Sequence, residues 1–169
     1  MILAILSDSH DHLDYLGRAL ERARSAGAQA IIHAGDFVSP FSLNPFQDWE
    51  GELYAVLGNN DGEREGLRRR FASLGAHYYE GPVQFKLGGL QISLQHFPYR
   101  EEEVAAAQLQ ASPERPTLLI SGHTHQPLLH REGALWLLNP GECCGWLSKR
   151  PTMALFDSAS RQAQLLELA

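Results

Sequence analysis

Five short apolar runs along the chain each end close to a side chain that can bind a metal ion. The runs cover residues 2–6, 30–32, 54–57, 92–94 and 118–120. The polar groups that follow them are, in chain order, Asp8 and His10, Asp36, Asn59, His96, and His123 and His125. Because ligands gather at the carboxyl ends of strands in such sheets, these groups are expected to meet along one rim of a β-sheet. The pattern predicts a two-metal hydrolase.

The length of the chain and its cysteines bear on the domain organisation and the compartment. The 169 residues are expected to form one domain, residues 1–169, and folding at this length buries roughly 70% of the surface of the unfolded chain. Cys143 and Cys144 are adjacent and too close for ordinary disulfide geometry, so they are expected to be buried thiols without a catalytic role. A cytoplasmic location suits such a chain.

Charge and hydropathy argue against a membrane or a long nucleic acid as partner. No stretch approaches the roughly 20 apolar residues of a membrane helix, and no basic segment of a secretory signal precedes the first apolar run. The formal net charge is -6, and no stripe combines basic with aromatic residues. A small substrate therefore suits the chain better than a long polymer.

The spacing of apolar residues changes from β-α units in the first half to hairpins in the second. Helices are expected at residues 11–26, with Asp11 as N-cap, and at residues 63–74 and 100–110, whereas two prolines permit only a short helix at 39–46. Strands are expected at residues 2–6, 29–32, 53–57, 83–87, 90–94, 117–121, 128–130, 135–138, 152–156 and 164–168. This order predicts an α/β fold, a four-layer α/β/β/α sandwich with two mixed β-sheets.

The spacing within the motifs supports a shared site. Asp8 and His10 are separated by one residue, as are His123 and His125, and residues i and i+2 of an extended chain point the same way. Each pair can therefore reach one site together. Taken singly, each motif is a weak signal, because an incidental surface pair or a hydrogen-bonded core histidine, such as the one expected at His33, explains it more often. Their joint occurrence at strand ends favours metal binding.

The ordered motifs resemble those of the calcineurin-like metallophosphoesterase superfamily. They are SerAspSerHis ending at residue 10, GlyAspPhe at 35–37, GlyAsnAsnAsp at 58–61, GlnHis at 95–96 and GlyHisThrHis at 122–125. The short length and the segment 139–145 resemble the small bacterial and archaeal phosphodiesterase branch. The resemblance implies two metal positions that share Asp36. One is held by Asp8, His10, Asp36 and His125, and the other by Asp36, Asn59, His96 and His123.

The donor set indicates which ions and which reaction to expect. Imidazole and oxygen donors without a thiolate fit Mn, Fe, Ni or Zn better than Ca or Mg, and the resemblance favours two Mn²⁺ or Ni²⁺ ions, with Fe or Zn as alternatives. Two such ions lower the pKa of a shared water, so that a bridging hydroxide attacks a small phosphodiester in line. The formal charges of two dications, Asp8, Asp36 and one hydroxide leave a single positive charge, which favours a diester monoanion over a monoester dianion.

Asn60 is the main departure from the superfamily pattern. The resemblance makes Asp36 and Asn60 the catalytic positions, yet Asn60 replaces a histidine that many members use to protonate the leaving oxygen. Since an amide cannot act as a general acid, substrates with good leaving groups are expected. His12 is a candidate for another proton donor, although its position favours a polar residue in the first turn of a helix. The expected substrate contacts are Asn60, Arg64 and Phe97. Phe97 either lines the leaving-group pocket or packs beneath the following helix.

Other functions stay open on the sequence alone. A metal-binding scaffold or protein-interaction module with a weakly active site is one, because the fold resembles that of the retromer subunit, where the catalytic histidine is also missing; a complete ligand set favours an enzyme. A nuclease or a phosphomonoesterase is another. Phe41, Phe46 and Trp49 are either a patch for a homo-oligomer or part of the core. Glu142 is expected to be solvated rather than to contact a metal ligand.

Overall fold

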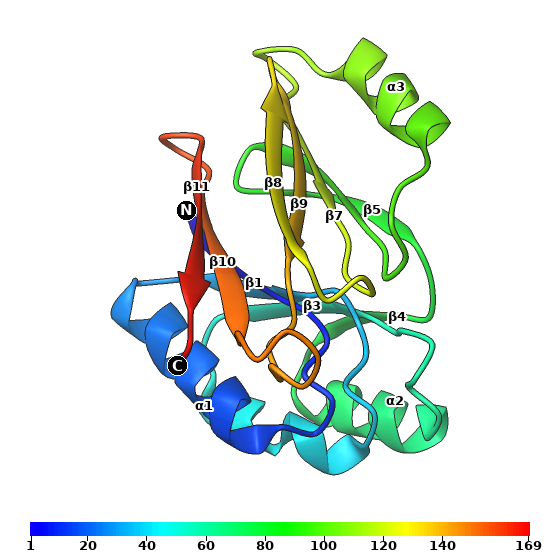
Figure 1. The fold of residues 1–169 in the computed structure, drawn as a ribbon, viewed down its shortest axis with the longest axis vertical. Helices are drawn as coiled ribbons and strands as arrows, with labels where there is room; N and C mark the ends of the chain where they lie inside the picture. The colour runs from blue at the N-terminus through cyan, green and yellow to red at the C-terminus, as the bar shows by residue number, and fades with distance from the viewer.

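Two β-sheets pack face to face in the computed structural model, which describes residues 1–169, and helices lie on both outer sides (Figure 1). The first sheet has the strand order β11 (Gln162–Glu167), β10 (Thr152–Asp157), β1 (Ile2–Leu6), β2 (Ala30–His33), β3 (Glu52–Val56), β4 (His77–Tyr79). The second has the order β5 (Val83–Leu87), β6 (Leu90–Leu94), β7 (Thr117–Ile120), β9 (Leu135–Pro140), β8 (Pro127–Glu132). The predicted four-layer α/β/β/α sandwich is confirmed.

The helices cover the two outer faces of the sandwich. The helices α1 (Leu13–Ser25) and α2 (Arg64–Ser73) and the 3-10 helix η1 (Pro40–Asp48) lie against the first sheet, and α3 (Glu101–Gln110) lies beyond the second sheet (Figure 1). None of them combines the length and the apolar character that a bilayer-spanning helix requires. The sheets and helices thus form the layers in the order that the sequence predicts.

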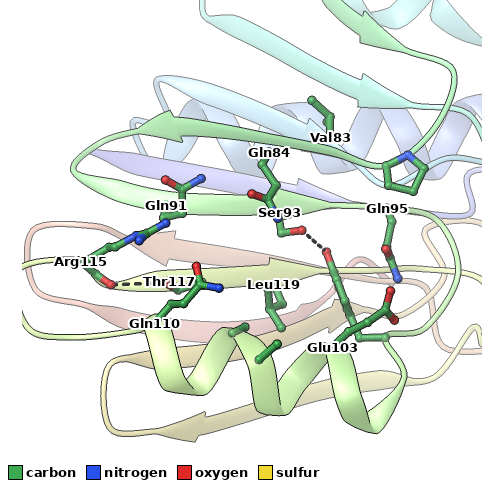
Figure 2. Close-up of a pocket in the computed structure, with 14 residues that line it drawn as sticks. Val83, Gln84, Gln91, Ser93, Gln95, Glu103, Gln110, Arg115, Thr117 and Leu119 are labelled. Carbon is green, nitrogen blue, oxygen red and sulfur yellow. Dashed lines mark hydrogen bonds between the residues drawn. The ribbon is translucent and has the colours of Figure 1, made fainter.

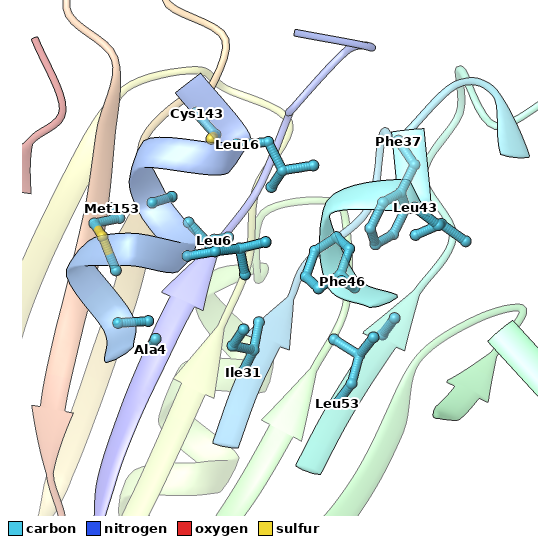
Figure 3. Close-up of a cluster of buried hydrophobic side chains, with 14 of the residues drawn as sticks. Ala4, Leu6, Leu16, Ile31, Phe37, Leu43, Phe46, Leu53, Cys143 and Met153 are labelled. Carbon is cyan, nitrogen blue, oxygen red and sulfur yellow. The ribbon is translucent and has the colours of Figure 1, made fainter. Parts of the chain in front are cut away.

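Two separate cores hold the layers together. Along β1, Leu3 and Ile5 face the second sheet, whereas Ala4 and Leu6 face the helices, as the alternation of side chains in a strand requires. Figure 3 shows the helix-side core, in which Leu6 and Ile31 of the sheet lie beside side chains of α1 and η1. Phe46 is buried in this core, whereas Phe41 is exposed, so core packing explains Phe46.

The five ligand-bearing strands are divided between the sheets. β1, β2 and β3 are parallel neighbours in the first sheet, and β6 and β7 are parallel neighbours in the second. The expectation of a single rim is therefore wrong. The physical reason lies in β6, where Leu90, Ile92 and Leu94 are buried and alternate with half-buried polar side chains, so that this strand packs one apolar face against the first sheet.

Two local predictions also need correction. The first helix begins at Leu13 with His12 as its N-cap, because the Asp11 carboxylate instead accepts hydrogen bonds from Ser39 N at 3.1 Å and Ser39 Oγ at 2.7 Å. Asp11 thus joins two loops rather than capping its own helix. The strand β4 was not predicted, because its three residues are too few to form a pattern and it exists only through pairing with β3.

Helix α3 packs loosely on the second sheet. It has no buried residue, and a polar pocket of about 380 Å³ lies between it and the outer face of β5, β6 and β7 (Figure 2). Gln84, Gln91, Ser93 and Thr117 line this pocket from the sheet and Gln110 lines it from the helix. No residue of the pocket is a predicted metal ligand.

Replacement of Phe156 by Ala is expected to destabilise the sandwich more than any surface change. Phe156 is fully buried between the sheets, and its ring meets that of Trp136 edge to face at 5.5 Å. The cavity that the change leaves should lower the free energy of unfolding by about 3–5 kcal/mol, measured by urea titration. Leu109→Ala, at an 89% exposed position, is the control and should change it by less than about 0.5 kcal/mol. A similar loss for both variants would contradict the assignment of this core.

Candidate metal centre

Four predicted ligands meet where the loops after β1, β2 and β7 come together. His10 Nε2 lies 3.8 Å from Asp8 Oδ1 and 3.4 Å from Asp36 Oδ2, and His125 Nε2 lies 3.4 Å from Asp8 Oδ1. The rings of His10 and His125 stack at 5.2 Å. Asp8, His10 and His125 therefore present one donor atom each to a common point, as a bound cation requires.

The remaining predicted ligands form a second group beside the first. Asn59 Oδ1 lies 2.9 Å from His96 Nε2 and 2.9 Å from His123 Nδ1. His96 Nε2 also lies 3.5 Å from Asp36 Oδ2, the oxygen that faces His10. Asp36 thus belongs to both groups, and all seven predicted ligands lie in one cluster where the two sheets meet.

The paired motifs reach the cluster in a way that the sequence did not predict. The backbone is not extended there, since Asp8, His10, His123 and His125 all have φ between 40° and 67°. His123 faces Asn59 and His125 faces Asp8, so the two members of this pair belong to different groups, as the resemblance implies. Left-handed backbone at residues other than glycine is strained and concentrates at functional sites. Asp36, with φ 61°, shares this conformation.

Two glycines allow the backbone to approach the ligands closely. A Cβ at Gly58 would clash with Asp36 Oδ1 and lie 2.7 Å from Asp36 N. A Cβ at Gly122 would clash with Ser7 Oγ and lie 2.8 Å from Asp8 Oδ2. Side chains of any size at these positions would displace a carboxylate, so glycine is required by space rather than by φ.

The hydrogen bonds of the histidines indicate which ring nitrogens are free for a metal. His96 Nδ1 must donate to Ala34 O at 2.8 Å, because a carbonyl only accepts. Neutral His96 therefore presents a lone pair at Nε2, which faces the Asn59 carbonyl oxygen without a hydrogen between them. Asp8 Oδ1 and His10 Nε2 are likewise buried without a hydrogen-bond partner. Such convergent, unpaired acceptors fit divalent transition metal ions, which the nitrogen and oxygen donors also suit.

The electrostatics of the cluster favour a bound cation as well. Burial opposes ionisation of Asp36, but the neighbouring His96 and the two hydrogen bonds from Asn60 outweigh it and hold the pKa of this carboxyl well below its usual range. The neighbouring Asp8 carboxylate raises the pKa of His10. Burial lowers the pKa of His96, but the Asp36 carboxylate outweighs this and raises it overall. Buried carboxylate charge thus draws positive charge to this place, which divalent ions supply.

Glu142 is a residue of the centre whose environment the sequence analysis predicted wrongly. It is fully buried rather than solvated, and its Oε2 accepts a hydrogen bond from His125 Nδ1 at 2.8 Å. Burial opposes its ionisation, but hydrogen bonds from Ser148 and His125 lower the pKa of Glu142 to about 2. The carboxylate therefore directs the lone pair of His125 Nε2 toward Asp8. One feature of the sequence sets Glu142 apart: it is the single charged residue in the otherwise uncharged stretch 134–148.

Asp61 is a second buried carboxylate whose role the sequence analysis missed. Asp61 Oδ2 accepts from Asp36 N at 3.0 Å and Gly58 N at 2.7 Å, and Oδ1 accepts from Val38 N at 2.7 Å. Burial raises the pKa of Asp61. This side chain ties the loop after β2 to the loop after β3, and so sets the position of Asp36 relative to Asn59. The last residue of the GlyAsnAsnAsp motif was the signal for it.

Replacement of Glu142 by Gln is expected to weaken metal binding without loss of the fold. The amide keeps an acceptor for the backbone but loses the charge that holds His125, and such outer partners contribute about 10–100-fold to metal affinity. Isothermal titration with Mn²⁺ measures the change. Glu132→Gln, at an exposed carboxylate at the end of β8, is the matched control and should bind as the wild type does. An unchanged affinity in the Glu142 variant would contradict its positioning role.

The other residues singled out from the sequence have separate environments. Asn60 donates from its backbone N to Asp36 Oδ1 at 2.9 Å and from Nδ2 to Oδ2 at 2.7 Å. Arg64 forms an exposed ion pair with Glu80 at 3.7 Å and contacts no predicted ligand. His12 caps α1, and His33 is a buried, hydrogen-bonded core residue whose pKa burial lowers to about 3.

Two aromatic side chains follow His96, and one of them borders the metal centre whereas the other packs beneath α3. Phe97 is half exposed, and its ring lies 4.6 Å from the ring of His123. Tyr99 instead lies beneath α3, where its hydroxyl donates to Ser93 Oγ at 3.0 Å. Phe97 therefore does not pack beneath the following helix, and it borders the centre.

Comparisons with known proteins place these features in a wider context. A family model described as a calcineurin-like phosphoesterase superfamily domain matches residues 1–161. The phosphodiesterase MJ0936 of Methanocaldococcus jannaschii is 28% identical over 163 residues, which are 96% of each chain. The solved structure of an archaeal phosphodiesterase has a TM-score of 0.87 at 28% identity and covers 99% of both chains. Zinc-bound Vps29 of Entamoeba histolytica shares the fold, with a TM-score of 0.66 at 18% identity over the whole of both chains.

Proposed function

Because the chain belongs to the calcineurin-like phosphoesterase superfamily, we propose that it is a metal-dependent phosphoric diester hydrolase that acts on a small phosphodiester. The observation that supports this most directly is the position of Asp36. Its Oδ2 lies 3.4 Å from His10 Nε2, after a strand of the first sheet, and 3.5 Å from His96 Nε2, after a strand of the second. A carboxylate between two sets of donors suits a ligand that two cations share.

The proposed binuclear site assigns each donor to one of two positions. One position comprises Asp8, His10, Asp36 and His125, and the other comprises Asp36, Asn59, His96 and His123. Divalent ions held there would act as Lewis acids on a phosphoryl oxygen and lower the pKa of a water molecule. Nitrogen and oxygen donors without a thiolate fit Mn, Ni, Fe or Zn. Among these ions, the resemblance to the small phosphodiesterases of this superfamily favours Mn²⁺ or Ni²⁺, with Fe or Zn as alternatives.

The side chains around these positions have distinct proposed roles. Asn60 holds Asp36 through its Nδ2 at 2.7 Å and can donate a hydrogen bond to a phosphate, but it cannot deliver a proton. The ion pair of Arg64 with Glu80 is exposed and therefore weak, so Arg64 is free to pair with an anionic substrate instead. Phe97 borders the His123 side, where its half-exposed ring can contact a bound substrate.

The charge of the centre supports a diester rather than a monoester as the substrate. Two divalent ions, two carboxylates and one hydroxide leave a single positive charge, which a diester monoanion cancels and a monoester dianion exceeds. We also propose that residues 1–169 act as one domain. The two free, buried thiols at Cys143 and Cys144 are compatible with the cytoplasm as the proposed location.

Metal analysis combined with a matched substrate panel tests this function. The panel comprises p-nitrophenyl diesters, the corresponding monoester, cyclic nucleotides, a short single-stranded DNA and pyrophosphate, each assayed with Mn²⁺, Ni²⁺, Fe²⁺ and Zn²⁺. We expect two metal ions per chain and a higher kcat/KM for the diesters than for the monoester with the same metal. Faster monoester hydrolysis would replace the proposal with a phosphomonoesterase, and preference for DNA would replace it with a nuclease.

A metal-binding scaffold is the second candidate, and the fold shared with Vps29 favours it. The complete donor set, in which Asp8, Asp36 and His96 are buried, speaks for an enzyme, because a binding platform has no chemical need for seven converging ligands. Two bound ions without turnover of any substrate in the panel would decide for the scaffold.

A further inference from the structure

Two aromatic side chains beside the proposed metal centre are exposed and join neither hydrophobic core. Phe97 is 52% exposed, and its ring lies 4.6 Å from that of His123 and 5.3 Å from that of His96. Trp146, in the loop between β9 and β10, is 53% exposed. Folding thus leaves two planar apolar surfaces open to solvent next to charged and polar ligands, where burial by a bound molecule would stabilise them.

The two rings lie beside different metal positions. Phe97 contacts His96 and His123, which belong to the position of Asn59. Trp146 instead lies beside the loop after β1, where its Nε1 donates to His10 O at 3.5 Å and its ring lies 4.8 Å from that of His12. A substrate bound across both metal positions therefore meets Phe97 on one side and Trp146 on the other.

The loop that carries Trp146 is held by the same carboxylate that orients a ligand. Glu142 Oε1 accepts from Leu147 N at 3.0 Å, and Glu142 Oε2 accepts from His125 Nδ1 at 2.8 Å. Lys149 Nζ donates to Trp146 O at 2.8 Å from the other side of the turn. The position of Trp146 relative to the centre is thus set before a substrate binds, which lowers the entropic cost of binding.

We propose, on the basis of the phosphodiesterase function above, that Trp146 and the 71% exposed Leu147 form a subsite for the retained organic group of the diester. Phe97 then contacts the leaving group. Asn60 occupies the position of the missing proton donor, and it directly follows Asn59, whose donor set with His96 and His123 is the one that Phe97 borders. Water adds its oxygen to phosphorus and loses a proton to solvent, and the ester bond to the leaving group breaks with its electron pair on the departing oxygen. The products are an aryl oxide and a phosphomonoester that carries the retained group. The substrate class is a diester whose retained group is planar and aromatic, an aryl ring or a nucleobase.

Two diesters with the same leaving group test this assignment. Bis(p-nitrophenyl) phosphate and methyl p-nitrophenyl phosphate both release p-nitrophenolate, but only the first retains an aromatic ring on phosphorus. We define the substrate ratio as kcat/KM for bis(p-nitrophenyl) phosphate divided by kcat/KM for methyl p-nitrophenyl phosphate. Trp146→Ala should lower this ratio by about 5- to 150-fold, the contribution of one stacked ring. Phe97→Ala should lower kcat/KM for both alike and leave the ratio unchanged. Leu109→Ala, on the outer face of α3, is the control for loss of an exposed apolar side chain.

A conservative variant separates the ring of Trp146 from its hydrogen bond. Trp146→Phe keeps an aromatic face but loses the donor to His10 O, so the substrate ratio should stay close to that of the wild type. A ratio as low as that of the Ala variant would assign the effect to the position of His10 and overturn the subsite. If the wild type cleaves neither diester, the phosphodiesterase proposal itself fails. If the wild type cleaves both diesters and Trp146→Ala leaves the substrate ratio unchanged, only the subsite proposal fails.

Fluorescence provides a readout that does not depend on turnover. Trp136 is buried and Trp49 packs against the helix-side core, so Trp146 is the indole at the centre. Bis(p-nitrophenyl) phosphate added to the metal-free protein should quench the wild type more than Trp146→Phe, and dimethyl phosphate should quench the two proteins equally. Equal quenching by the nitrophenyl diester, whatever its extent, would overturn the proposal.

Discussion

Replacement of Asp36 by Asn is expected to lower the rate of phosphodiester hydrolysis by more than about 10³-fold. This loss exceeds the decrease of about 10²–10³-fold that follows removal of one hydrogen-bond donor from an active site. The reason is that Asp36 Oδ2 is the only carboxylate oxygen within 3.5 Å of histidines from both donor groups. An amide of the same shape keeps the packing but removes the negative charge between the two metal positions. The metal content should fall below two ions per chain, measured by elemental analysis of the purified protein.

The matched control for this change is Asp48→Asn. Asp48 is exposed at the end of η1, and its carboxylate has no hydrogen-bond partner, so the variant should retain metal and activity. Thermal unfolding of the metal-free proteins distinguishes loss of the site from loss of the fold. An Asp36 variant that still binds two ions and turns over diesters within about tenfold of the wild-type rate would contradict the bridging role, since one bridging charge should contribute far more.

The choice of substrate should depend on the leaving group because of Asn60. General acid catalysis contributes about 10²–10⁴ in rate, and an amide cannot supply it. We therefore expect aryl diesters, whose leaving groups depart without a proton, to be cleaved far faster than alkyl diesters. The structure places the Asn60 side chain on Asp36 Oδ2 at 2.7 Å, next to the metal positions, where a histidine would be close enough to donate a proton.

Introduction of a histidine at this position tests the explanation directly. Asn60→His should raise kcat/KM for a methyl or ethyl diester by up to about 10²-fold, the lower end of the range for general acid catalysis, with little change for nitrophenyl diesters. Asn60→Gln is the control, because it also lacks a titratable proton. Similar rates for alkyl and aryl diesters in the wild type would show that a group other than Asn60 already donates the proton.

The layers of the fold and the convergence of the seven predicted ligands could be predicted because their signals are local. Each ligand follows an apolar strand directly, and glycines such as Gly58 and Gly122 precede the crowded positions. Strand boundaries shifted by only one or two residues. The assumption of extended chain at Asp8 and His10 failed, because the loop turns through left-handed backbone, which residues other than glycine adopt rarely, although Asp and His do so more often than most.

The supporting residues could not be predicted in the same way. Glu142 was expected to be solvated, and its burial depends on backbone amides of residues 147 and 148 and on His125, 17 positions earlier in the chain. Asp61 contacts the backbone of Asp36 and Val38, which precede it by more than 20 residues. Trp146 lies beside His10 from the opposite end of the chain. Contacts between residues so far apart in the chain leave no periodic pattern in the sequence.

The sequence alone determined the chemistry of the centre: which donors it contains, that no thiolate is among the predicted ligands, and that the position after Asn59 carries an amide instead of an imidazole. Only the tertiary structure decided that the donors come from two sheets, that the paired motifs adopt left-handed backbone, and which carboxylates hold the ligands in place. The physical reason is that donor identity is a property of single side chains, whereas their arrangement follows from burying the apolar faces of strands that are distant in the chain.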